Sequence, residues 1–127
     1  MPGPVDAAQL ALATISRANA EHYTWGQNCH GWHLVKEPEL SVIEEVMPAQ
    51  TAEQLHRHRV ARQFFYVLAG EAVMEIAGKS VAIAAGEGFS VAPGQAHRIR
   101  NVSNQDVRFL VISQPSTKYG DRENLES

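Results

Sequence analysis

Residues 56–101 decide the fold, and they read HRHRVARQFFYVLAGEAVMEIAGKSVAIAAGEGFSVAPGQAHRIRN. The stretch consists of short runs rich in Val, Ile and Phe, such as RQFFYVL at 62–68, and Gly or Asn separates them. Runs of roughly four to eight residues with regular turn signals predict the strands of an all-β sandwich or barrel. The same pattern continues outward to LSVIEEVM at 40–47 and VRFLVIS at 107–113.

This pattern divides the chain into three parts. Residues 1–31 are expected to form an N-terminal arm and a lead-in segment that mixes Asn, His, Gly and aromatic side chains. Residues 32–113 are the expected barrel, and the polar residues 114–127 are an expected surface tail. Within the arm, DAAQLALA at 6–13 favours a short helix with Asp6 as its N-cap, or a loose arm. The length of 127 residues fits one domain.

Composition excludes several classes of function. The chain is 44% hydrophobic and 20% charged, which is ordinary for a globular protein. A net charge of −3 gives no basic surface for nucleic acid or an anionic membrane, so we expect neither partner. The first residues have no basic start and include Asp6 and Gln9, so we expect no signal peptide and a cytoplasmic location. Cys29 is the single cysteine, which rules out an internal disulfide and favours a small buried hydrophobe.

Two histidines begin the stretch that carries chemistry. His56 and His58 are two residues apart in a predicted strand, so both imidazoles project from one face. Neutral imidazole suits Zn, Cu, Fe and Ni, but a pair of this kind also fits two exposed polar residues on a strand edge. The surroundings decide between these interpretations. The spacing reads H-x-H-x4-Q-x6-G from His56 to Gly70, then G-x5-A-P-G-x2-H-x3-N from Gly86 to Asn101.

This spacing resembles the two paired motifs of the cupin superfamily, with Gln63 in place of a glutamate and Ala92 in place of a proline. The resemblance implies a double-stranded β-helix, a jelly-roll barrel. It also implies one divalent transition metal (Fe, Mn, Ni, Zn or Co), and a homodimer. The implied metal ligands are His56, His58, Gln63 and His97.

Gln63 is the informative departure from the family pattern. An amide offers a neutral carbonyl oxygen, so the full charge of the metal remains on the site and favours an anionic ligand. Cupins with three His and one Gln are similar to those that open unsaturated uronates, and the chain also resembles short cupins similar to mannose-6-phosphate isomerases. We therefore predict a metal-dependent enzyme that isomerises or ring-opens a sugar acid or sugar phosphate, with the metal as Lewis acid. An Fe- or Mn-dependent dioxygenase and a non-enzymatic ligand- or metal-binding module remain alternatives.

Strand alternation predicts which neighbours of the ligands line the interior. The residues expected inside share parity with Gln63 or His97, and they are Phe65, Val67 and Ile99. Those expected outside have the opposite parity, and they are Tyr66, Arg98 and Arg100. This placement argues against an arginine clamp from these strands.

Three further positions carry expectations. Glu44 and Glu45 are adjacent in a strand, so at most one faces inward, and that one is the candidate general base. We expect Asn101 to bond to backbone as a structural residue. We expect His33 to be solvated or satisfied within the core.

Overall fold

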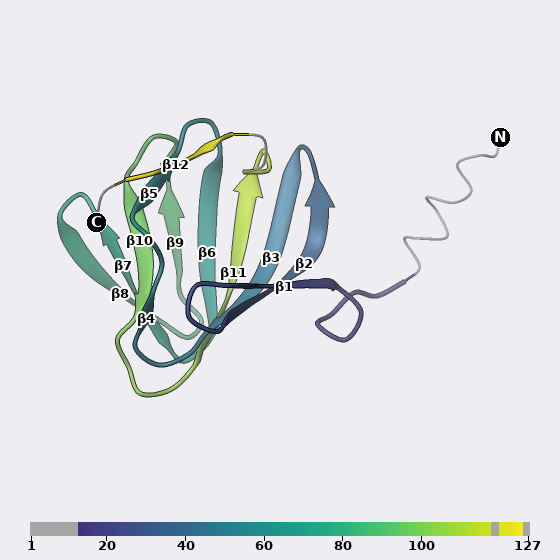
Figure 1. Cartoon of the computed structure of the whole chain (residues 1–127), viewed down its shortest axis with the longest axis horizontal. Helices are drawn as coiled ribbons and strands as arrows, with labels where there is room; N and C mark the ends of the chain where they lie inside the picture. The colour runs from purple at the N-terminus through teal and green to yellow at the C-terminus, as the bar shows by residue number, and fades with distance from the viewer. Residues whose placement is uncertain (1–12, 118–119, 126–127) are drawn as a thin grey trace.

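The computed structural model describes residues 13–117 and 120–125, and within these ranges it has twelve strands in two antiparallel sheets. Figure 1 shows the sheets curving around a common interior, which confirms the predicted all-β barrel. The described ranges contain no helix long and apolar enough to span a membrane. Neighbours in the first sheet follow the order β1 (Glu21–Trp25), β2 (Cys29–Glu37), β3 (Leu40–Met47), β11 (Val107–Gln114), β6 (Arg62–Ala69) and β9 (Gly88–Val91).

The second sheet carries the histidine motifs. β4 (Thr51–Ala52) lies off the main path of this sheet and pairs with β10. The main path follows the order β12 (Arg122–Asn124), β5 (His56–His58), β10 (His97–Asn101), β7 (Glu71–Ile76) and β8 (Lys79–Ala84).

The core lies between the two sheets because successive side chains on each strand alternate in burial. In β10 the burial alternates from His97 to Asn101, and in β11 it alternates over most of the strand. The expected inward positions Phe65, Val67 and Ile99 are at most 2% exposed, which confirms the predicted parity. Arg98 and Arg100 lie on the outer face, as predicted. Large side chains that fill the core beside these inward residues are Met47, Met74, Ile83 and Phe109.

Asn101 has the structural role that the sequence predicts. Its Nδ2 donates to the backbone oxygens of Met47 at 2.9 Å and Gln105 at 2.7 Å. Its Oδ1 accepts from the backbone N–H of Ser103 at 3.0 Å. One buried amide thereby joins the end of β3 to the loop before β11.

The sheets extend beyond the predicted barrel range of 32–113 at both ends. β1 and the start of β2 lie within the predicted lead-in segment, and β12 lies within the predicted tail. β12 reads REN and pairs with β5 through its backbone, Arg122 opposite His58, so it needs no alternating apolar residues. The predicted helix at 6–13 falls outside the described residues except for Ala13.

Candidate metal centre

Three buried histidines meet between β5 and β10. Because β5 reads HRH, alternation buries His56 and His58 and leaves Arg57 exposed. His97 begins β10 and pairs directly with His56 across the sheet. One ring nitrogen from each of the three imidazoles lies within 4.8 Å of the other two. The fold therefore assembles the three histidines that the spacing singles out.

The hydrogen bonds of the rings leave one nitrogen of each free for a metal. The Nδ1 atoms of His56 and His97 contact backbone carbonyl oxygens two residues earlier, at 2.8 and 2.9 Å. The Nδ1 of His58 contacts the Asp121 carboxylate at 3.1 Å. Carbonyl and carboxylate oxygens only accept, so in each neutral ring Nδ1 carries the hydrogen and Nε2 keeps its lone pair. Metal-binding histidines are typically oriented by such partners.

Burial keeps these rings neutral. It lowers the pKa of His56 to about 3 and that of His58 to about 4, and it also lowers the pKa of His97. The positive charge of Arg122 acts in the same direction on all three pKa values. At neutral pH the lone pairs are therefore available to a metal without the loss of a proton.

Gln63 lies beside the histidine cluster. Its Nε2 donates to Ser113 Oγ at 3.0 Å, which directs its carbonyl oxygen toward His97 Nε2 at 3.2 Å. With the hydrogen of His97 on Nδ1, these two atoms are both acceptors and have no proton between them. A cation resolves such a contact, and three imidazoles with one amide oxygen suit a divalent transition metal. The residues present thus fit the metal that the sequence resemblance implies.

A cavity of about 130 Å³ adjoins these side chains. Ile43, Phe65 and Val111 give part of its wall an apolar character. The polar residues at its wall, besides the candidate ligands, are Tyr23, Glu45, Glu53, Thr117 and Arg122. The site therefore combines neutral metal donors with carboxyl, hydroxyl and guanidinium groups from other strands.

Of the two adjacent glutamates, Glu45 faces this cavity and Glu44 does not. Tyr23 Oη donates to Glu45 Oε2 at 2.6 Å, and burial raises the pKa of Glu45 to about 8. Glu44 lies on the opposite face, where Arg108 Nη1 donates to its Oε2 at 3.1 Å. Glu45 thus lines the cavity, and Glu44 lies on the other face of β3.

Tyr23 and Glu53 are cavity residues that the sequence did not indicate. Burial raises the pKa of Tyr23, and the Glu45 carboxylate raises it further. Glu53 Oε2 lies 3.8 Å from His56 Nε2, and burial raises the pKa of this carboxyl to about 7. If one strand ran from Glu53 to His56, alternation would put these two side chains on opposite faces. The break between β4 and β5 resets the alternation, so both lie at the cavity.

Asp121 and Arg122 come from the predicted tail. Asp121 Oδ1 accepts from the backbone N–H of Val60 at 2.7 Å, while Oδ2 contacts His58 Nδ1. One carboxylate therefore holds the end of β5. Arg122 lines the cavity itself. The sequence signal that could have pointed to them is a cluster of charged residues in an otherwise polar end segment, which is a weak one.

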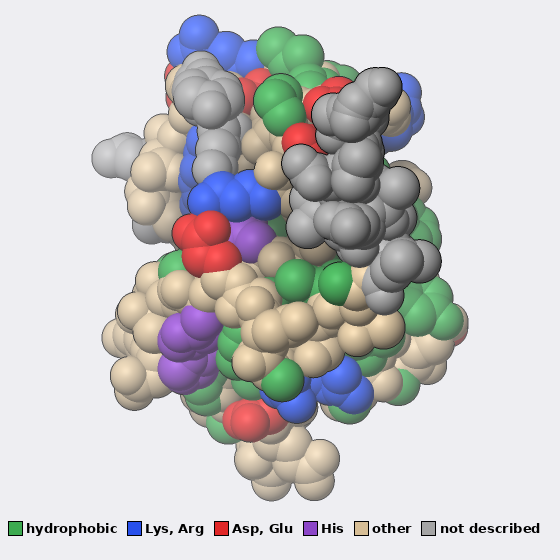
Figure 2. All heavy atoms as spheres, turned by 90° about the vertical axis from the view of Figure 1, so that its right-hand side faces the viewer, with side chains coloured by type: hydrophobic (Ala, Val, Ile, Leu, Met, Phe, Trp, Pro, Cys, Tyr) green, Lys and Arg blue, Asp and Glu red, His purple; other side chains and the backbone are tan. Residues whose placement is uncertain are grey.

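The other histidines lie away from this centre. His22 and His30 stack at a centroid distance of 5.0 Å on β1 and β2, next to Trp32. Figure 2 shows histidine side chains gathered on the surface of this face. His33 packs on the ring of Tyr23 at 5.0 Å. Their exposure or packing separates them from the three buried rings.

Comparison with known proteins identifies the family. A family model described as the cupin domain matches residues 42–113. An uncharacterised protein of Methanocaldococcus jannaschii is 26% identical over 94 residues, which cover 74% of this chain and 75% of that protein.

Two solved structures have a similar fold. A predicted oxalate decarboxylase from Thermotoga maritima has a TM-score of 0.72 at 23% identity, covering 82% of this chain and 100% of that one. A sugar phosphate isomerase of the cupin superfamily from Silicibacter pomeroyi has a TM-score of 0.69 at 15% identity, covering 82% and 76%. At these identities the likeness shows the fold alone.

Proposed function

Because this chain belongs to the cupin domain family, we propose that it is a metal-dependent enzyme that isomerises or ring-opens a small anionic metabolite, a sugar acid or sugar phosphate. Among the solved structures of similar fold are a predicted oxalate decarboxylase and a sugar phosphate isomerase, and oxalate and sugar phosphates are anions. The fold hosts other chemistries as well, so the proposal rests on the site.

The observation that carries it is the composition of the donor set. The rings of His56, His58 and His97 are neutral, and the group directed at them from β6 is the amide oxygen of Gln63. A divalent ion held by four neutral donors keeps its full charge and attracts an anionic oxygen of the ligand. When bound there, the metal would supply Lewis-acid polarisation of a carbonyl or enediol oxygen.

The residues of the chain supply the remaining functions. Glu45 is the candidate acid or base, since it lines the cavity and its pKa of about 8 lies close to neutral pH. Tyr23 holds that carboxyl in place through its 2.6 Å hydrogen bond. The apolar wall formed by Ile43, Phe65 and Val111 limits the access of water to the proton that is moved.

The test begins with metal content. Protein purified without chelator or histidine tag is analysed for bound elements beside a variant with His56→Ala and His58→Ala. We expect roughly one equivalent of transition metal per chain in the unaltered protein and none in the variant, because the variant lacks two of three imidazole ligands. Unsaturated uronates and sugar phosphates are then offered to both, and conversion is followed by NMR.

Metal and turnover should be lost together in His58→Ala alone. Full activity in a metal-free variant would contradict the proposal. Consumption of oxygen with one of the substrates would replace it by the dioxygenase alternative. Ligand binding without turnover, under any of the metals, would favour a non-enzymatic binding module.

A further inference from the structure

We propose that Arg122, delivered by the C-terminal strand β12, forms a carboxylate-binding subsite beside the metal centre. The inference rests on the proposed function in one respect, that the ligand is an anion which also meets the metal. It names the group of the ligand that is bound and the part of the chain that binds it.

The position of Arg122 is set by the strand that carries the histidines. β12 pairs with β5 so that Arg122 lies opposite His58. The pairing is reinforced at both ends, where the backbone N–H of Arg59 donates to Asp121 O at 3.0 Å and that of Leu125 donates to Leu55 O at 2.8 Å. The backbone that carries the Arg122 side chain is therefore fixed relative to the strand that carries His56 and His58.

The guanidinium keeps donors available for a ligand. Its Nε donates to Asn124 Oδ1 at 2.8 Å, which orients the group. Its Nη1 lies 3.6 Å from Glu53 Oε2, which is an ion-pair contact longer than a hydrogen bond. The side chain of Arg122 is 39% exposed, so a molecule arriving from solvent can reach it.

The chemistry of the cavity favours a carboxylate. A guanidinium presents a planar fork of donors that matches a carboxylate with two parallel hydrogen bonds. Arg122 is the one cationic side chain among the described residues that line this cavity. A volume of about 130 Å³ equals that of about four water molecules. It accepts a carboxylate with a neighbouring hydroxyl, and the rest of a larger ligand would extend toward solvent.

Glycolate and glycolamide are matched probes for this subsite. Glycolamide has a neutral amide of nearly the same shape in place of the carboxylate of glycolate. Binding of each is measured by calorimetry to protein of known metal content, with and without the metal. We expect glycolate to bind more tightly than glycolamide to the unaltered protein in both states.

Three variants test the assignment. Arg122→Gln should weaken glycolate binding ~10- to 100-fold, which is the effect of losing a charged hydrogen-bond pair, and leave glycolamide binding nearly unchanged. Glu53→Gln should strengthen glycolate binding, because it removes the negative charge that competes for Arg122. Arg98→Gln is the matched control, since this arginine lies on the outer face and donates to Glu75 at 2.7 Å, and it should bind glycolate like the unaltered protein.

The outcomes separate this inference from the proposed function. Unchanged glycolate affinity in Arg122→Gln, with metal content intact, overturns the subsite and leaves the metal centre standing. Failure of the unaltered protein to distinguish glycolate from glycolamide overturns it as well. If the protein takes up no metal but still shows binding of glycolate that depends on Arg122, the subsite holds and the proposed function fails. A thermal melt of each variant shows whether it is folded.

Discussion

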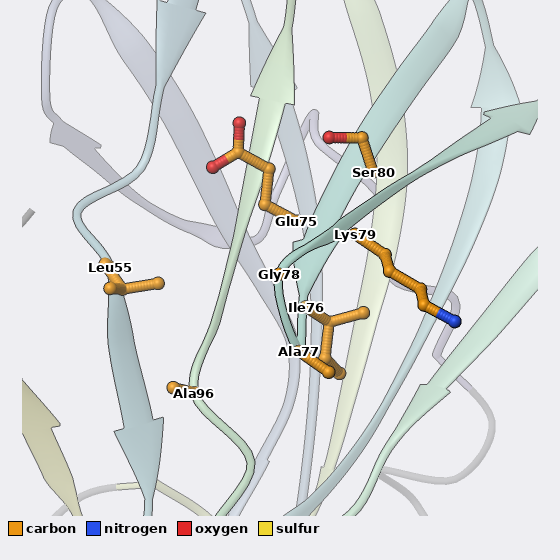
Figure 3. Close-up of a pocket in the computed structure, with 8 residues that line it drawn as sticks. All are labelled: Leu55, Glu75, Ile76, Ala77, Gly78, Lys79, Ser80 and Ala96. Carbon is orange, nitrogen blue, oxygen red and sulfur yellow. The ribbon is translucent and has the colours of Figure 1, made fainter.

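Two hollows of the described barrel differ in volume, and the smaller one adjoins the histidine cluster. The groove outside, between β5 and the β7–β8 hairpin, has a volume of about 390 Å³, against about 130 Å³ for the cavity inside. Figure 3 shows its lining, in which Glu75 and Lys79 are the charged side chains and most of the others are apolar or small. None of the described residues that line the outer groove is a histidine, whereas two of the three clustered histidines line the inner cavity. Volume is therefore a poor guide to the site in this molecule.

The pKa values of carboxyl groups in the two hollows are also shifted in opposite directions. Inside, burial raises the pKa of Glu45 to about 8. At the outer groove, hydrogen bonds from Arg98 and Arg100 lower the pKa of Glu75. A carboxylate compensated by two guanidinium groups stays ionised and holds neighbouring strands together. For Glu45, burial outweighs the hydrogen bond from Tyr23 and the charge of Arg122, so this carboxyl can exchange a proton near neutral pH.

The largest expected effect is the loss of bound metal when a candidate ligand in the inner cavity is removed. Removal of a polar side chain from the outer groove is the comparison. His97→Ala should lose the bound metal, because it removes the imidazole that pairs with His56 and faces Gln63. Ser80→Ala, in the outer groove, should keep it. Elemental analysis of both proteins, with circular dichroism to show that they are folded, measures the difference. Full metal content in His97→Ala would place the metal elsewhere.

A smaller loss of metal affinity is expected from the residue that orients His58. Asp121 uses both carboxylate oxygens, one for Val60 N–H and one for His58 Nδ1. Asp121→Asn offers a single acceptor, so one of these contacts is lost and the metal should bind ~10- to 100-fold more weakly.

Glu123→Gln provides the matched comparison two residues further along the chain, because Glu123 pairs with Arg57 at the surface. Competition titration with a chromophoric chelator measures the affinities of both variants. Equal affinities would mean that Asp121 supports the strand alone and does not tune the metal centre.

The contrast between the two carboxyls should also appear in the pH dependence of stability. The pKa of Glu45 rises from 4.5 to about 8 on folding, so between these values the folded, metal-free chain holds a proton that the unfolded chain has released. The contribution of Glu45 to stability must then fall as pH rises through this window, by up to about 1.4 kcal/mol per pH unit. The lowered pKa values of His56, His58 and His97 act in the opposite direction below the ordinary pKa of histidine. In urea melts across this window, Glu45→Gln should therefore make the slope of stability against pH more positive than that of the unaltered protein.

Glu75→Gln should leave that slope unchanged. The pKa of Glu75 is lowered in the folded chain, so its contribution to stability is present above its ordinary pKa and is lost only at more acidic pH. Slopes that are the same for Glu45→Gln and the unaltered protein would show that Glu45 is not protonated in the folded state near neutral pH.

The sequence predicts the inner cavity only in part, and the reason is physical. The histidine spacing determines which rings meet, because two-residue alternation on β5 and the turn before β10 are local features. The choice between Glu44 and Glu45 could not be made from parity, because β3 has apolar residues on both faces, Val42 and Val46 on one and Ile43 and Met47 on the other. Arg122 and Asp121 were missed because β12 is held by backbone pairing and polar contacts, which leave no apolar period in the sequence.

The smallest predicted effect compares a glycine on each side of the barrel wall. A Cβ at Gly31 would lie 2.2 Å from the ring of Tyr23, whereas one at Gly78 would meet nothing within 4 Å but would sit at a φ of +74°. Gly31→Ala should therefore cost ~1–3 kcal/mol by displacing Tyr23, and Gly78→Ala about 1–2 kcal/mol through its backbone.

A double-mutant cycle distinguishes these two causes. In a Tyr23→Ala background, Gly31→Ala should become nearly neutral, because the ring that it strikes is gone. Gly78→Ala should cost the same in both backgrounds, since its strain lies in its own φ angle. Urea denaturation gives the four free energies of unfolding for each cycle. If Gly31→Ala remains as costly without the tyrosine ring, the inner glycine is required for some other reason, and Tyr23 is not held over the cavity by the bare backbone of β2.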